Sequence, residues 1–153
     1  MSIKEKLSAL GLTLPTAAAP VAAYVPAVKS GNLVFTAGQL PVVDGKLIKE
    51  GKVGSDVSAD DAKGLAQLCA LNALAAISLI AELDQIERVV RLGGFVNCAP
   101  GFTAIPGVVN GASELLIKIF GDVNGKHART AVGVAELPLN APVEIEMVVQ
   151  LKN

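Results

Sequence analysis

The segment 125–130, which reads GKHART, holds the only histidine of the chain, His127, followed closely by Arg129. After Arg129 the sequence turns to small and β-branched residues, Thr130 to Ala135, which is typical of a strand. An arginine at the start of such a strand can be an ordinary solvated charge. Its planar fork of N–H donors also matches the two oxygens of a carboxylate, so Arg129 is a candidate receptor for a small anionic acid. His127 is interpreted as a loop residue.

The second candidate group lies in the run 143–151, where Glu144 and Glu146 alternate with apolar residues. Strand side chains alternate between faces, so the apolar set forms a core face and both glutamates lie on the other. A glutamate near a bound acid can transfer a proton. Glu144 is therefore a candidate partner of Arg129.

The loop 137–142 predicts that the two last strands form a hairpin. A symmetric register then opposes residues 135 and 144, and both glutamates share a face with Arg129, Ala131 and Gly133. This face is nearly bare in its middle, which would let a ligand or another chain approach the backbone. Arg129 and Glu144 would be about 20 Å apart at about 3.3 Å per residue, so they would meet only across an interface between copies.

Local signals along the chain predict the elements that position these groups. Caps, turn residues and apolar periodicity predict alternating strands and helices, hence a single α+β domain over 1–153 with two helices on one face of a sheet. The expected features are a capped helix 2–10, an extended segment 13–28 with Pro15, Pro20 and Pro26, a strand 33–37, a turn at Asp44-Gly45, a helix 58–82, a strand 86–97 with a bulge at Gly93-Gly94, a loop 97–107, a helix 108–120 ended by Gly121, and strands 130–136 and 143–151.

The composition indicates what the protein associates with. Of 153 residues, 52% are hydrophobic, 3% aromatic and 18% charged, with a net charge of −1. The charged fraction is below the usual value of about 25%, so we expect a homo-oligomer that covers part of its apolar surface. The absence of a basic stripe or an aromatic cluster argues against a nucleic-acid partner.

The cysteine and histidine content argues against a metal site. Cys69 and Cys98 are isolated, and one histidine gives no ligand cluster. The chain also has no stretch that is typical of a membrane or export signal. Its longest apolar stretch, 65–81, is too short and too polar to cross a membrane. Glu5 and Pro15 interrupt any signal-peptide pattern, so we expect a cytoplasmic protein with no membrane partner.

Four stretches make the chain similar to the Rid family of reactive intermediate deaminases, also called the YjgF or endoribonuclease L-PSP family. They are AAYVPAVKSGNLVFTAGQLP (22–41), the helix near 60–82, VNGASELLIKIFG (109–121) and HARTAVGVAELPLNAPVEIEMV (127–148). The resemblance implies a chorismate-mutase-like fold and a homotrimer with clefts between subunits. It also implies cofactor-free hydrolysis of enamine or imine acids, such as 2-aminoacrylate, to 2-oxo acids and ammonia.

The resemblance implies roles for individual residues. Arg129 would hold the substrate carboxylate and Glu144 would assist the water, whereas Tyr24 and Asn110 would line the cleft. Ala131 stands where the family often has cysteine, so only its backbone carbonyl could hold the water. Gln39 and Phe102 are further substrate-binding candidates, and the loop around Phe102 is longer than in the best-studied members.

Other interpretations of the chain stay open. Tyr24 can be a packing residue and Asn110 a polar residue at a helix start. A non-catalytic trimer that binds or senses small acids would use the same cleft. A ribonuclease, as in the older family name, is disfavoured by the few aromatic residues and the lack of a basic patch.

Overall fold

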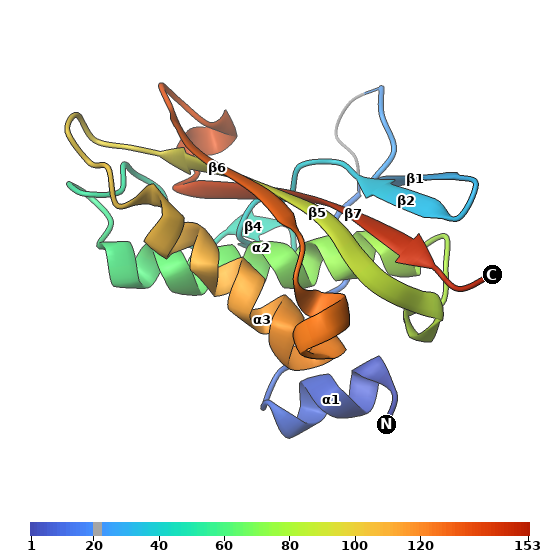
Figure 1. Ribbon diagram of the computed structural model, residues 1–153. Coiled ribbons are helices and arrows are strands. Elements are labelled where there is room, and N and C mark those ends of the chain that lie inside the picture. Colours follow the sequence, from blue (N-terminus) through green and yellow to red (C-terminus); the bar gives the residue numbers. More distant parts are fainter. Residues whose placement is uncertain (20–22) are drawn as a thin grey trace.

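The computed structural model of the protein describes residues 1–19 and 23–153, and its centre is a mixed sheet with strand order β1-β2-β7-β5-β6 (Figure 1). Helices α2 and α3 cover one face of this sheet, and α1 packs against α3 (Figure 1). The α+β prediction with two helices on one face is confirmed. In chain order the elements are α1 (Ile3–Ala9), β1 (Ala27–Ser30), β2 (Leu33–Thr36), β3 (Val42–Val43), β4 (Lys46–Leu47), α2 (Ala59–Ser78), η1 (Leu83–Gln85), β5 (Ile86–Asn97), α3 (Ile105–Gly125), β6 (Ala128–Val134), η2 (Pro138–Asn140) and β7 (Val143–Leu151).

The prediction of a hairpin between the two last strands is wrong. Strand β5 lies between β6 and β7, pairing with β6 in parallel and with β7 in antiparallel fashion. Helix α3 is the crossover that a parallel β5–β6 pair requires. The loop 137–142 therefore spans the width of β5, and β6 is left as an edge strand.

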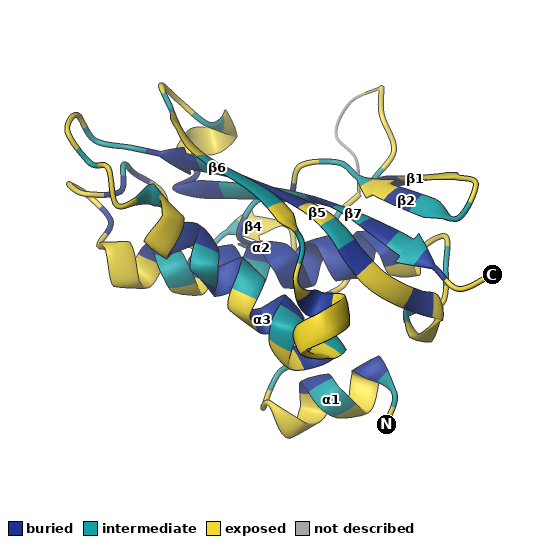
Figure 2. Cartoon of the chain, in the orientation of Figure 1, coloured by how far each residue is buried: buried dark blue, intermediate teal, exposed yellow. Residues whose placement is uncertain are grey.

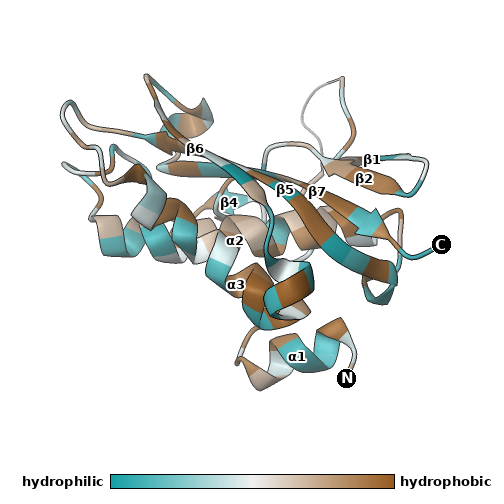
Figure 3. Cartoon of the chain, viewed as in Figure 1, coloured by the Kyte–Doolittle hydropathy of each residue, from teal (hydrophilic) through white to brown (hydrophobic). Residues whose placement is uncertain are grey.

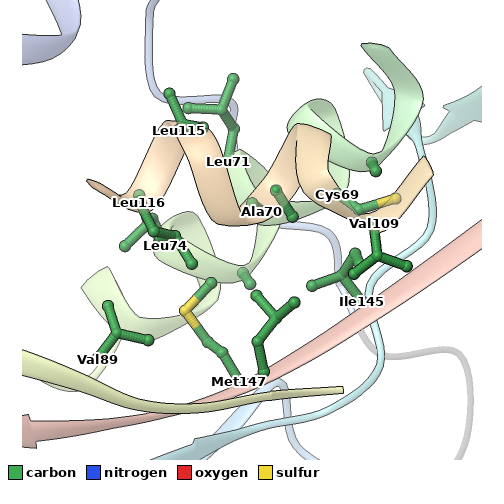
Figure 4. Close-up of a cluster of buried hydrophobic side chains, with 14 of the residues drawn as sticks. Cys69, Ala70, Leu71, Leu74, Val89, Val109, Leu115, Leu116, Ile145 and Met147 are labelled. Carbon is green, nitrogen blue, oxygen red and sulfur yellow. The ribbon is translucent and has the colours of Figure 1, made fainter. Parts of the chain in front are cut away.

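The core lies between the sheet and the two long helices. Alternate residues of β7 are buried, as the period of two predicted, and Met147 packs among Leu74, Val89 and Leu116 (Figure 4). Helix α2 is buried along most of its length because the sheet and α3 both cover it (Figure 2). Cover on two sides suits a helix whose apolar residues extend around much of its surface.

The face of the sheet away from the helices keeps apolar side chains exposed. Val28, Phe35 and Val132 retain 52%, 44% and 39% of their accessible surface. Strand β2 is strongly hydrophobic in Figure 3, yet part of it is exposed in Figure 2. We call this surface the open face of the sheet. No helix in the described part of the chain combines the length and apolar character that a membrane crossing needs.

Three local signals act as the sequence predicted. Ser2 and Glu5 form a reciprocal capping box at α1, and the Ser58 hydroxyl accepts a hydrogen bond from the backbone N–H of Asp61 at the start of α2. Asp44 and Gly45, with φ of 49° and 74°, form the turn between β3 and β4.

Several predicted boundaries differ from the structure. Strand β1 was not predicted, since it lies partly in the proline-rich segment, where Pro20 falls outside the described residues. Helix α2 ends at Ser78, four residues early. Helix α3 begins at Ile105, and Gly121, with φ of 82°, interrupts it before a final turn to Gly125.

The predicted bulge at Gly93-Gly94 is also wrong. The irregularities of β5 lie earlier, between Ile86 and Arg88 and between Val89 and Arg91. The two glycines instead leave room for side chains on each face. A Cβ on Gly93 would come within 2.8 Å of the Glu146 side chain, and one on Gly94 within 2.5 Å of Val109.

Candidate functional site

Arg129 lies near the start of β6, the edge strand that runs along α3 (Figure 1). It pairs in register with Leu92 of β5, whose neighbour on β7 is Met147. Leu92 and Met147 belong to the buried core, so Arg129 lies on the helix-covered face of the sheet. Its side chain is half-buried rather than freely solvated.

Two side chains of α3 hold one end of the guanidinium. Nη1 of Arg129 donates to Oδ1 of Asn110 at 2.7 Å and to Oγ of Ser113 at 3.2 Å. Asn110 and Ser113 are three residues apart, so they lie on the same face of the helix. No protein acceptor is recorded for Nε or Nη2 among residues 1–19 and 23–153. These two nitrogens form one side of the fork that suits a carboxylate.

His127 extends this network from the loop before β6. Its Nδ1 lies 2.7 Å from the carbonyl oxygen of Gly125, and its Nε2 lies 3.0 Å from Oγ of Ser113. Burial lowers the pKa of His127, and the nearby Arg129 charge lowers it further, against the opposing effect of the bond to Gly125. The loop placement is confirmed, but His127 also supports the candidate site.

Sequence reasoning missed Ser113 altogether and gave His127 no role at the site. The available signal was the spacing of Asn110 and Ser113 along one helix face. That signal becomes specific only when the parallel β5–α3–β6 arrangement brings this face against Arg129.

The small residues after Arg129 lie beside side chains of the core and of the loop before α3. Ala131 pairs with Gly94 and packs against the core. A Cβ on Gly133 would come within 3.1 Å of both Sγ of Cys98 and Cδ1 of Ile105. The chain's own α3 and the loop before it border this strip, but Ala131 is only half-buried and Gly133 is exposed. That a ligand approaches the backbone here stays a prediction.

Glu144 lies on the open face, beside Phe95 of β5. Its carboxyl group packs against Gly38, where no side chain would fit. Burial raises the pKa of Glu144, and the like charge of Glu146 raises it further. The predicted sharing of one face by Glu144, Glu146 and Arg129 is wrong, because the pairing through β5 places them on opposite faces.

Gln39 lies next to Glu144 through the backbone. The N–H groups of Gln39 and Ile145 each donate to the other residue's carbonyl, at 2.8 and 3.0 Å. The Gln39 side chain is buried, and its Nε2 donates to the carbonyl of Ala37 at 3.3 Å. The strand end at Gly38-Gln39 therefore forms the wall against which the Glu144 carboxyl rests.

The remaining two candidates lie in loops. Tyr24 is 49% exposed in the segment before β1. Phe102, in the loop before α3, packs over Gly54, where a Cβ would come within 2.9 Å of its ring. Within one copy of the protein the candidates therefore form two separate groups. Arg129 lies with Asn110, and Glu144 lies with Gln39.

A comparison with protein families agrees with this architecture. Residues 4–151 match the family described as "YjgF/chorismate mutase-like, putative endoribonuclease". The chain belongs to the YjgF family. This confirms the resemblance that the sequence motifs indicated.

Individual YjgF-family relatives cover almost the whole chain. Protein TCP17 of Trypanosoma cruzi is 41% identical over 99% of this chain and 95% of its own. The 2-iminobutanoate/2-iminopropanoate deaminase of Dermatophagoides farinae is 30% identical over 92% of this chain and 95% of its own. The crystal structure of protein Atu1372 from Agrobacterium tumefaciens is 44% identical, with a TM-score of 0.89, over 99% of this chain and 94% of that one.

Proposed function

We propose that this protein hydrolyses imine or enamine forms of small 2-amino acids, such as 2-aminoacrylate and 2-iminopropionate, to 2-oxo acids and ammonia. The observation that carries the proposal is the anchored guanidinium of Arg129. Asn110 and Ser113 engage Nη1 and leave Nε and Nη2 as a fixed pair of donors for a substrate carboxylate. The deaminase name of one relative supports the same reaction class.

The reaction requires only water and a group that transfers protons. An enamine first becomes the imine when its methylene carbon gains a proton and its nitrogen loses one. Water then adds to the carbon of the C=N bond, and the carbinolamine breaks its C–N bond to release ammonia and leave the C=O of the oxo acid. A carboxyl group with a raised pKa can serve both steps near neutral pH, because it gains and loses a proton readily. Glu144 has this property, since it is half-buried and next to a like charge.

We propose that the complete site forms between copies of the chain in a homotrimer. Arg129 and Glu144 lie on opposite faces of one sheet, so a ligand held by Arg129 would reach Glu144 of a second copy. The exposed Val28, Phe35 and Val132 give the open face the apolar surface that an oligomer would cover. Light scattering that gave a monomer at micromolar concentration would contradict the shared site.

A coupled assay tests the reaction. A pyridoxal-phosphate-dependent dehydratase generates 2-aminoacrylate from serine, and pyruvate release above the spontaneous rate is followed with and without the protein. We expect acceleration by the parent protein and loss of it in Arg129→Ala. Lys118→Ala, which removes an exposed positive charge from α3, is the control and should behave as the parent. Pyruvate binding without acceleration would instead indicate a non-catalytic protein that binds small acids.

A further inference from the structure

A chain of hydrogen bonds leads from the end of α3 to Arg129. It runs from the carbonyl of Gly125 to His127, then to Ser113 and then to Nη1 of Arg129, with donor–acceptor distances of 2.7, 3.0 and 3.2 Å. Gly125 and Ser113 belong to α3, whereas His127 and Arg129 lie on either side of Ala128 at the start of β6. The chain therefore ties the strand to the helix at the point where the guanidinium is held.

The chemistry of the groups fixes the direction of the bonds to Gly125 and from Arg129, and a neutral ring fixes the direction of the third. A carbonyl oxygen only accepts, so Nδ1 of His127 carries a proton and donates to Gly125. In the neutral ring Nε2 is then an acceptor, and it takes the hydroxyl hydrogen of Ser113. The Ser113 hydroxyl donates to the ring and keeps its lone pairs for Nη1 of Arg129. A neutral imidazole is thus the form that aligns Ser113 for the guanidinium.

The charges around His127 favour the same neutral form. Arg129 follows His127 by two residues along the chain. Arg88 and Lys126 line a hollow of about 440 Å³ beside the ring. Lys126 is itself paired with Asp122 at 2.7 Å. Burial and the Arg129 charge both lower the pKa of His127, against the bond to Gly125, and so favour the neutral ring.

We propose that His127 and Ser113 are positioning residues, which act together to hold the Arg129 guanidinium in the orientation that receives a substrate carboxylate. This inference rests on the proposed role of Arg129 and goes beyond it, since neither residue is expected to touch the substrate. Ser113 fixes one hydrogen of Nη1, Asn110 fixes the other, and His127 orients the Ser113 hydroxyl. Without the pair the guanidinium could rotate about its bond to Asn110.

The test uses pyruvate, the product of the proposed reaction, to measure carboxylate binding without turnover. Its dissociation constant is measured by calorimetry, and kcat/KM is measured in the coupled assay. We expect Ser113→Ala and His127→Ala each to weaken pyruvate binding and lower kcat/KM by about five- to tenfold, which is the usual effect of one lost hydrogen bond. Ser113→Thr, which keeps the hydroxyl, should recover most of the loss. Ser78→Ala, which removes a hydroxyl that donates to the carbonyl of Ala75 in its own helix, is the matched control.

A double-mutant cycle separates positioning from a general structural effect. Because His127 acts through Ser113, the double variant Ser113→Ala/His127→Ala should be no worse than Ser113→Ala alone. Additive losses, or pyruvate binding by Ser113→Ala equal to that of the parent, would overturn the proposal. If Ser113→Ala does not fold, His127→Ala alone gives the test, and pyruvate binding by it equal to that of the parent would overturn the proposal. A parent protein that binds no pyruvate would instead refute the proposed function itself.

Discussion

Arg129 and Glu144 lie on opposite faces of one sheet, two strands apart. Arg129 is in register with Leu92 on the helix-covered face, and Glu144 is in register with Phe95 on the open face. Three residue steps of β5 separate these two positions, or about 10 Å at about 3.3 Å per residue. The two groups best suited to bind and deaminate a small acid therefore face away from each other within one chain.

This relationship predicts that two inactive variants restore activity in mixed oligomers. In a site that joins Arg129 of one copy to Glu144 of the next, co-expressed Arg129→Ala and Glu144→Ala chains form some interfaces with both residues intact. Random assembly leaves about one quarter of the sites complete, so about a quarter of the parent activity should return. Co-expression of each variant with itself is the control. Mixed oligomers with no activity would indicate that one chain supplies both residues.

Replacement of Arg129 tests the two-donor grip directly. Arg129→Lys keeps the charge but loses the planar fork, and a charge-assisted hydrogen bond contributes about 1.5–3 kcal/mol. We expect kcat/KM to fall about ten- to a hundredfold, and further in Arg129→Ala. Loss of the bonds to Asn110 and Ser113 should lower the free energy of unfolding by only about 1 kcal/mol. A variant that unfolds instead would show that Arg129 is mainly structural.

The lowered pKa of His127 predicts a loss of stability in mild acid. Between the unfolded value of about 6.5 and the lower folded value, the unfolded chain binds more protons. The free energy of unfolding should therefore fall as the pH drops from 7.5 to 5. Urea unfolding of the parent and of His127→Gln, which does not titrate, checks this. The stability difference between the two should shift in favour of the variant at low pH, and parallel curves would contradict the prediction.

The raised pKa of Glu144 predicts a response to its neighbour. Glu146→Gln removes the like charge, so the pKa of Glu144 should fall towards its ordinary value while burial keeps it raised. Carbon NMR titration of the glutamate carboxyls measures the change. Glu114→Gln, which removes an exposed glutamate paired with Lys63, is the control. Since the folded chain holds this proton to higher pH, the contribution of Glu144 to stability falls as the pH rises through the folded pKa.

The thiols should not be needed for turnover. Cys98 lies close to Gly133 on β6, but burial raises its pKa, although Lys52 opposes the change. Cys69 is fully buried, and burial raises the pKa of its thiol well above the ordinary value. Neither group is a ready thiolate. We expect Cys98→Ala to keep the parent rate in the coupled assay, and a folded but inactive variant would refute the proposed chemistry.

The sequence alone determined the elements whose signals are local. The capping box of Ser2 and Glu5, the Asp44-Gly45 turn and the alternation along β7 each depend on residues a few positions apart. These contacts do not depend on residues far away in the chain, so local pattern and propensity predict them. The motif around Arg129 likewise identified the family from adjacent residues.

Only the tertiary structure decided how these elements face one another. A loop of a few residues suggested that β6 and β7 pair, but the α3 crossover inserts β5 between them and places Arg129 and Glu144 on opposite faces. The same crossover brings Ser113 against His127 and Arg129. Strand order depends on contacts between residues far apart in the chain, and no local spacing records which strands become neighbours.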